Sequence, residues 1–345
     1  MGYGFNITSE VAVPVNLKSG IYLIEKQIPF IIKTTNPVDL VIVYPSNTTN
    51  AYSRSGGKSL YDKIDRPSHV SFLRPVELQS QSLYGLKWFA TLTNYSIGYI
   101  ADSDLDDYNT IKNAQIITIV GHSEYWTRKA RKNFDQFVNA GKNAIILSGN
   151  TMWWQVRYTE NNQLICHKDA TTDPISDLLL KTIVWEDRTL EYSILTSIGA
   201  DFPHGGYGLQ SDTGWDGYKI SSPTSPLLEG LDVKKGDILS LPSGEYDGAP
   251  ILNFTNDGYP VLDKAALGFQ QVELIGFDRG SRGGAETIGT FIVFKKNSSS
   301  GIVVNAASYD WCSERGIGGP SGEKFKRITL NAIEKLLKHQ AVFSN

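Results

Sequence analysis

The chain has 345 residues, of which 41% are hydrophobic and 20% are charged, and it contains 32 Gly, 14 Pro and only 2 Cys. This composition is typical of a globular protein and excludes a disordered chain, a collagen and a small disulfide-linked fold. The 33 basic and 36 acidic residues are interspersed and give a formal net charge of -3. We therefore expect neither nucleic acid nor a membrane surface as a partner.

The first residues show no signal-peptide pattern and the chain has few cysteines, and both features point to a reducing compartment. The first residues, MGYGFNITSE, contain neither a basic nor an apolar signal-peptide region. No later stretch approaches the ~18 consecutive apolar residues of a membrane-spanning helix. Cys166 and Cys312 lie far apart and form no CxxC motif, so one bridge at most could form. These features predict a cytoplasmic protein with reduced thiols.

The first predicted elements are extended. Residues 20–33 form two short apolar runs around a charged turn, which predicts a hairpin within a β-rich N-terminal segment, residues 1–36. Residues 39–44 (DLVIVY) form a β-branched run without polar alternation, as expected for a strand covered on both faces in a parallel sheet. A long polar loop follows, and loops of that length are usually functional or disordered.

Strands and amphipathic helices then alternate along the chain. The expected strands are residues 95–100, 111–120, 144–147 and 301–306, and the expected helices are residues 79–93, residues 127–141 capped by Thr127, and a long helix beginning at Ser321. This order predicts an α/β domain over residues 37–340 with a doubly wound, mostly parallel sheet. Residues 185–300 break the rhythm with Gly-, Asp- and Pro-rich stretches, and we interpret them as a strand-rich insertion.

Polar residues follow several of the predicted strands. Ligands bind outside the carboxyl ends of the strands in an open α/β sheet, so these segments are expected to meet at one edge. They are residues 52–61, 121–126 (GHSEYW), 148–150 (SGN) and 309–311 (YDW). The chain has no GxGxxG, P-loop, HExxH or GxSxG motif, and its five histidines lack metal-ligand spacing. We therefore expect no nucleotide cofactor.

Several of these runs carry a resemblance to a known family. The runs AYSRSGGKSLYD, VGHSEYWT, LSGN followed by WWQVR, GEYD and a closing strand-DW-helix occur in this order between about residues 20 and 340. As a set they resemble the C-terminal catalytic region of the N,N-dimethylformamidase large (beta) subunit-like family. The resemblance implies a class I glutamine amidotransferase-like fold, which is flavodoxin-like, and hydrolysis of a small amide at a mononuclear iron.

The resemblance also implies a set of site residues. By the matching motifs, the metal ligands would be Tyr52, Tyr61 and Glu124, while His122, Asn150 and Glu245 would be catalytic groups near the metal. The related amidase also has an upstream β-sandwich and a separate small subunit, and its loop between the two tyrosines is longer. The substrate, the need for a small subunit and homo-oligomerisation therefore stay open.

The chemistry of these residue types agrees with that ligand set. Phenolate and carboxylate are hard oxygen donors that suit a hard cation. Two phenolates and one carboxylate carry three negative charges, which balance Fe(3+). A tyrosine with an ordinary pKa of ~10 binds at neutral pH only where the cation displaces its proton.

Two other functions stay open from the residues alone. Ser148 follows a predicted strand and could act as a nucleophile with His122 as base in a metal-free hydrolase, although no oriented acid completes a triad. The chain could also be a non-catalytic module that keeps the same fold and binds carbohydrate or a protein partner, because a fold does not determine a function.

Overall fold

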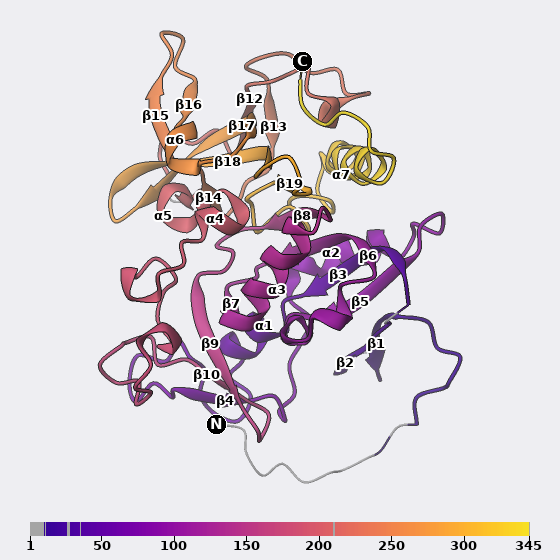
Figure 1. Ribbon diagram of the computed structural model, residues 1–345, viewed down its shortest axis with the longest axis vertical. Coiled ribbons are helices and arrows are strands. Elements are labelled where there is room, and N and C mark those ends of the chain that lie inside the picture. The colour runs from indigo at the N-terminus through magenta and orange to yellow at the C-terminus, as the bar shows by residue number, and fades with distance from the viewer. Residues whose placement is uncertain (1–9, 11, 26–27, 35, 210, 345) are drawn as a thin grey trace.

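The computed structural model describes residues 10, 12–25, 28–34, 36–209 and 211–344 (Figure 1). Strands β1 (Gly20–Ile24) and β2 (Ile28–Ile32) pair antiparallel with each other. This pairing confirms the predicted N-terminal hairpin, which stands beside the main body of the protein (Figure 1).

Five strands form a parallel region in the centre of the protein. They are β3 (Val38–Tyr44), β5 (Ile97–Ala101), β6 (Ala114–Gly121), β8 (Asn143–Ser148) and β19 (Ile302–Asn305), and their order is β19-β8-β6-β3-β5. Their apolar runs lack polar alternation because both faces are covered. Neighbouring Ile116 and Ile117 of β6, for example, are both fully buried but belong to cores on opposite faces.

Beyond β19 the same sheet continues with antiparallel strands. The two long strands β17 (Gln271–Arg282) and β18 (Ala285–Lys295) pair with each other, and β18 pairs with β19. Gly283 and Gly284, with φ of 59° and 82°, form the connecting turn, where a two-residue hairpin requires the left-handed conformation. Short strands β11 (Gly206–Tyr207), β12 (Gly217–Ile220), β13 (Ile238–Ser240) and β14 (Glu245–Gly248) extend this region.

The predicted doubly wound, mostly parallel fold is therefore wrong, and the sheet is mixed. Residues 185–300 were interpreted as a strand-rich insertion, and they contribute β17 and β18 to the large sheet, where these two strands pair antiparallel. An antiparallel hairpin needs only a tight turn, whereas every added parallel strand needs a crossover. The regular alternation of strand and helix consequently ends after β8.

Smaller sheets surround the large one. Strands β4 (His69–Ser71), β10 (Gln163–Ile165), β9 (Trp154–Thr159) and β7 (Tyr125–Thr127) form a second sheet, while β15 (Ile251–Phe254) pairs with β16 (Pro260–Leu262). The α-helices are α1 (Ser46–Tyr52), α2 (Ser80–Phe89), α3 (Arg128–Asn139), α4 (Leu195–Ile198), α5 (Phe202–Gly205), α6 (Lys264–Leu267) and α7 (Gly322–Leu337).

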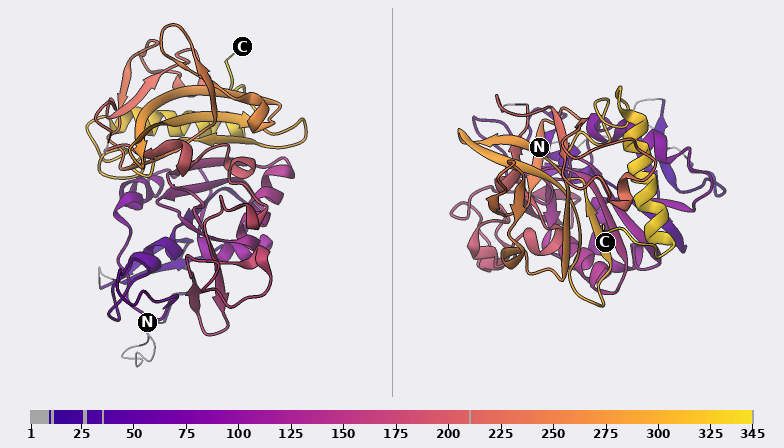
Figure 2. Two further views of the ribbon diagram at one scale, coloured as in Figure 1. Left: turned by 90° about the vertical axis from the view of Figure 1, so that its left-hand side faces the viewer. Right: turned by 90° about the horizontal axis from the view of Figure 1, so that it is seen from above.

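Helices cover both faces of the large sheet. Leu86 of α2 and Phe325 of α7 pack with Phe291 of β18 in one core, and α7 lies along this face (Figure 2). Phe134 of α3 packs with Ile292 in the core on the other face. No helix within the described residues is both long enough and apolar enough to cross a membrane.

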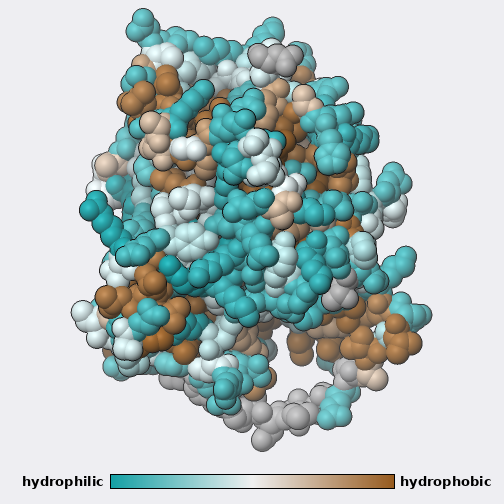
Figure 3. Space-filling model, in the orientation of Figure 1, coloured by the Kyte–Doolittle hydropathy of each residue, from teal (hydrophilic) through white to brown (hydrophobic). Residues whose placement is uncertain are grey.

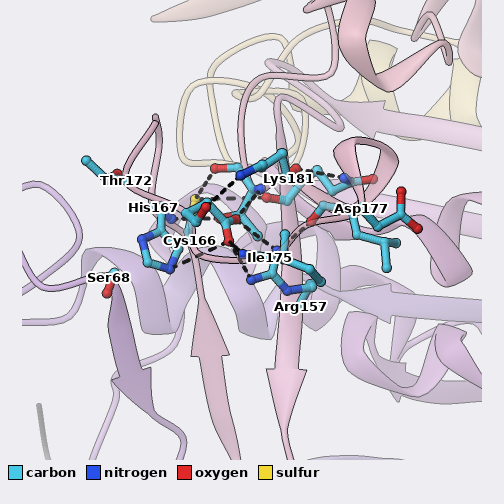
Figure 4. A network of polar contacts seen from close by, with 12 residues as sticks. Ser68, Arg157, Cys166, His167, Thr172, Ile175, Asp177 and Lys181 are labelled. Atoms are coloured by element: carbon cyan, nitrogen blue, oxygen red, sulfur yellow. Dashed lines mark hydrogen bonds and ion pairs between the residues drawn. The ribbon is translucent and has the colours of Figure 1, made fainter. Parts of the chain in front are cut away.

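A buried ion pair fixes the loop that follows β10. Both terminal nitrogens of Arg157 donate to the carboxylate of Asp173, at 2.8 and 2.9 Å, within a larger polar network (Figure 4). Thr182 donates to the same carboxylate from its backbone N–H and its hydroxyl. Burial alone would raise the pKa of Asp173, but the hydrogen bonds from Arg157 and Thr182 hold this pKa well below its usual value.

Candidate functional site

Two tyrosines stand side by side at the end of α1. Tyr52 is the last residue of this helix, and the backbone N–H of Leu60 donates to the carbonyl of Ala51 at 2.9 Å, which folds the following loop back onto the helix. The rings of Tyr52 and Tyr61 stack with their centroids 4.0 Å apart. A single short segment therefore supplies two of the predicted metal ligands.

A carboxylate of Asp102 fixes the start of the same helix. Pro45, the residue before α1, provides no capping side chain. Asp102, just after β5, accepts hydrogen bonds from the backbone N–H of Asn47 at 3.0 Å and from the hydroxyl of Ser46 at 2.5 Å. An acceptor at this place satisfies a helix N–H that has no partner within the helix. Because Asp102 and α1 are far apart in the sequence, no local pattern indicates this contact.

Glu124 lies between β6 and β7, directly beside the tyrosines. The Tyr61 hydroxyl donates to its two carboxylate oxygens at 2.8 and 2.7 Å, and the indole N–H of Trp154 donates to it at 3.0 Å. Its own backbone N–H donates to the hydroxyl of Thr48 in α1 at 2.8 Å. The carboxylate is only 3% exposed, so these contacts determine its orientation.

His122 connects the tyrosines to a second carboxylate. Its Nε2 lies 3.3 Å from the Tyr52 hydroxyl, 3.4 Å from Glu124 and 3.7 Å from Glu245. Its Nδ1 lies 3.1 Å from the carbonyl oxygen of Gly149, which can only accept, so we assign a proton to Nδ1. The imidazole therefore holds two carboxylates next to one phenol.

Asn150 completes the cluster from the end of β8. Its side-chain amide donates to Glu245, the first residue of β14, at 3.1 Å. The backbone of Asn150 is left-handed, with φ of 49°, a conformation that asparagine tolerates better than most residues. Its side-chain oxygen is buried and accepts no hydrogen bond from the described residues, so this acceptor is left without a partner beside the amide nitrogen that binds Glu245.

All six site residues named from the sequence thus lie in one cluster. They come from the α1 loop, from the ends of β6 and β8, and from β14. The parallel strands β6 and β8 end at the same edge of the sheet because their registers align Gly121 with Ser148. Their roles as metal ligands and catalytic groups stay predictions.

The electrostatics of the cluster keep the phenols neutral in the absence of a cation. Tyr52 and Tyr61 are 44% and 38% exposed, but their hydroxyl groups lie against the cluster, where desolvation and the charge of Glu124 raise the pKa of both above the usual value. Burial alone would raise the pKa of Glu124, but His122 and Lys168 hold it below its usual value. The pKa of His122, which burial would lower, is raised to about 9 chiefly by Glu245 and Glu124.

The donor set suits a hard, highly charged cation. Within the described residues, no group of three or more His, Cys, Asp or Glu side chains could hold a metal ion. A metal at this place would therefore need the tyrosine oxygens. The Tyr61 hydroxyl already touches the Glu124 carboxylate, and the stacked ring brings Tyr52 beside it. The Tyr52 hydroxyl lies 3.3 Å from His122 Nε2, which is itself 3.4 Å from Glu124, and the ionised forms of the three groups carry three negative charges.

Ser148, the alternative nucleophile, lies in the core. It is fully buried, and its hydroxyl accepts hydrogen bonds from Thr151 at 3.0 Å and from the backbone of Ser123 at 3.2 Å. Both ring nitrogens of His122 face other groups. The geometry therefore gives Ser148 a packing role at the end of β8.

Three further residues contact the cluster and were not chosen from the sequence. The ammonium of Lys168 lies 3.6 Å from the centre of the Tyr61 ring, Trp154 binds Glu124, and the Tyr309 ring packs edge-on against His122 at 5.3 Å. Tyr309 belongs to the segment after β19 that the sequence placed at the strand ends, although it was not named as a site residue. Lys168 follows β10 of the second sheet, and no motif marks it.

The cluster opens into a groove of about 1290 Å³. His122, Glu245, Tyr52 and Tyr309 line its inner end. A ligand in the groove would therefore reach the imidazole, one carboxylate and one phenol directly.

Comparisons with known proteins identify one family. Residues 6–316 match the family model described as N,N-dimethylformamidase beta subunit-like, C-terminal. A search of curated proteins finds no match. Among solved structures, a crystal structure of a ThuA-like protein from Bacteroides uniformis shares 11% identity, with a TM-score of 0.41 over 88% of this chain and 91% of that chain.

Proposed function

Because the chain belongs to the N,N-dimethylformamidase beta subunit-like family, we propose that it hydrolyses the carbon–nitrogen bond of an amide at a single metal ion held by Tyr52, Tyr61 and Glu124. We propose ferric iron as the metal, since two phenolates and one carboxylate neutralise a trivalent ion. The observation that carries this proposal is the contact of the Tyr61 hydroxyl with both oxygens of a buried carboxylate, with Tyr52 stacked alongside.

The metal, when bound, would supply Lewis acidity and lower the pKa of a bound water. The surrounding residues would move protons. Burial raises the pKa of Glu245 above its usual value, and its carboxyl group lies 3.7 Å from His122 Nε2, so Glu245 is placed to pass a proton to the leaving amine. Asn150 and His122 orient Glu245 from two sides.

His122 has a second proposed role. Its position between Glu124 and Glu245 stabilises the imidazolium, and a cationic N–H at the inner end of the groove can donate to the oxygen of an amide. The carbonyl of Gly149 fixes the ring through Nδ1, so Nε2 points toward the groove. The buried oxygen of Asn150 can accept a hydrogen bond from bound water or substrate.

The test combines metal content, spectroscopy and turnover. Full-length protein loaded with iron should contain about one iron per chain, show a tyrosinate-to-iron absorption band and release dimethylamine from N,N-dimethylformamide. Glu124→Gln and Tyr52→Phe should weaken the band and lose the activity. Tyr84→Phe, a change at an exposed tyrosine on α2, should retain both. Absence of the band after iron loading, or full activity of Glu124→Gln, would overturn the proposal.

A further inference from the structure

The groove is larger than a simple formamide needs. Its volume of about 1290 Å³ exceeds the ~300–1,000 Å³ typical of pockets for drug-sized ligands. An amide bound at His122 and Glu245 would occupy only the inner end. The rest of the groove runs between α1 and the start of α2 toward the β1–β2 hairpin, so a substrate could extend well beyond its reacting bond.

Near the hairpin the groove is lined by apolar side chains, together with the charged residues Glu77 and Lys87. Leu23 and Ile28 of the hairpin are 44% and 49% exposed, and Leu78 and Leu83 face them from the start of α2. Apolar residues gather over this hairpin on the surface (Figure 3). Water contact with these side chains is unfavourable, and an apolar ligand chain would relieve it.

A second hollow continues the apolar surface. It has a volume of about 980 Å³, lies between the hairpin and α2, and shares three leucines, Leu23, Leu78 and Leu83, and also Lys87 with the groove. The apolar surface is therefore continuous from the outer end of the groove to the space beneath the hairpin.

The start of α2, which forms part of the groove wall, is held beside His122 by hydrogen bonds. The side chain of Gln79 donates to the carbonyl of His122 at 2.9 Å and accepts from its backbone N–H at 2.7 Å. This paired contact fixes the start of α2 beside the imidazole. The fold therefore fixes the distance between the reacting groups and the apolar end. A ligand that contacts both must have a chain long enough to cover this distance.

We propose that this protein acts on amides that carry a long apolar chain, with the amide at His122 and Glu245 and the chain against Leu83, Leu78 and Leu23. This inference rests on the proposed hydrolase function. Hydrolysis would break the amide C–N bond and form a C–O bond, with water supplying the hydroxyl to the acyl carbon and a proton to the amine. The products would be a carboxylic acid and an amine, one of which carries the chain.

The test uses two homologous series of amides. N-alkyl-N-methylformamides place the chain on the amine, and N,N-dimethylalkanamides place it on the acyl group. In the preferred series, kcat/KM should rise by up to about fourfold for each methylene that the groove covers. Leu83→Gln and Leu23→Gln should flatten this rise. Leu252→Gln, at a 63% exposed position on β15, should preserve it.

A binding measurement separates this inference from the hydrolase proposal. Calorimetry with 2-alkanones of increasing length, which cannot be hydrolysed, should show tighter binding with length in the wild type and a flat response in Leu83→Gln. Length-dependent binding without cleavage of any amide would support the apolar site and overturn the hydrolase proposal. Cleavage of amides with no effect of chain length in either series would overturn the apolar site alone.

Discussion

Replacement of Tyr61 by phenylalanine removes one proposed ligand oxygen and leaves the stacked ring in place. In the metal-free protein the Tyr61 hydroxyl donates to both oxygens of Glu124 at 2.8 and 2.7 Å. A hydrogen bond to a charged group contributes about 1.5–3 kcal/mol, and the buried carboxylate cannot recruit water easily in exchange. We therefore expect Tyr61→Phe to lower the free energy of unfolding of the metal-free protein by that amount, measured by urea denaturation at pH 7.

The same variant should change how many protons the metal displaces. Both phenols are neutral without a cation because burial and Glu124 raise their pKa, so each must lose its proton to become a ligand. Wild-type protein should consequently release one more proton on binding ferric iron than Tyr61→Phe does. Calorimetric titration with a weak ferric chelate, repeated in buffers of different ionisation enthalpy, measures this difference.

The control is Tyr84→Phe, which alters an exposed tyrosine outside the cluster. It should match the wild type in unfolding free energy and in proton release. Equal proton release by wild type and Tyr61→Phe would refute the reasoning, because the phenol would then not be a ligand. An unchanged iron affinity in Tyr61→Phe would refute it in the same way.

Three further predictions concern single residues. Asp173→Asn breaks an ion pair whose carboxylate is buried and should cost about 3–5 kcal/mol at pH 7 by urea denaturation, whereas Asp257→Asn at an exposed pair should leave the free energy of unfolding nearly unchanged. The pKa of Asp173 is held well below its unfolded value of about 3.9. The stability that this carboxylate contributes is therefore present above about pH 4 and is lost as the pH falls through the lowered pKa, so Asp173→Asn should be less sensitive to acid below about pH 4. Glu245→Gln should lower kcat about 10²–10⁴-fold with iron content unchanged, and equal loss of iron would contradict a proton-transfer role. Gly244→Ala would place a Cβ against the Tyr309 ring and should cost about 1–3 kcal/mol in thermal unfolding; an unaltered melting temperature would show that the ring moves freely.

The local elements could be predicted where sequence pattern and burial agree. The run DLVIVY forms β3 because both faces of that strand are covered, and Thr127 caps α3 by accepting from the backbone N–H of Ala130 at 2.9 Å. The long polar loop after β3 is only partly a loop. It contains α1, whose start depends on Asp102 from another strand, and this long-range contact leaves no local signal.

The large sheet could not be predicted in full. Residues 271–295 are interrupted by Gly283 and Gly284, which resemble loop residues, although they form the tight turn between β17 and β18. These strands are largely buried on both faces, so they lack the alternation typical of an antiparallel hairpin. β18 then pairs with β19, which follows it closely in sequence, whereas the parallel pairing of β19 with β8 joins segments that are remote in sequence.

The candidate site could be predicted further than the fold. The family motifs indicate six residues. Those that follow β6 and β8 meet because these parallel strands end at the same edge of the sheet. Lys168 and Trp154 approach the cluster from the second sheet, whose pairing was not foreseen. The contribution of these two residues therefore required the three-dimensional structure.

The pairing of β8 with β19 has a consequence for synthesis of the chain. Ala144 lies opposite Val303 in this parallel pair, so the partner of β8 is made more than a hundred residues later. Until β19 has been synthesised, β8 exposes apolar side chains that are buried in the folded protein, and the backbone N–H and C=O groups along one edge of β8 stay unpaired. Nascent chains stalled between these strands should therefore be held by chaperones or aggregate, while chains that extend past residue 305 can close the sheet.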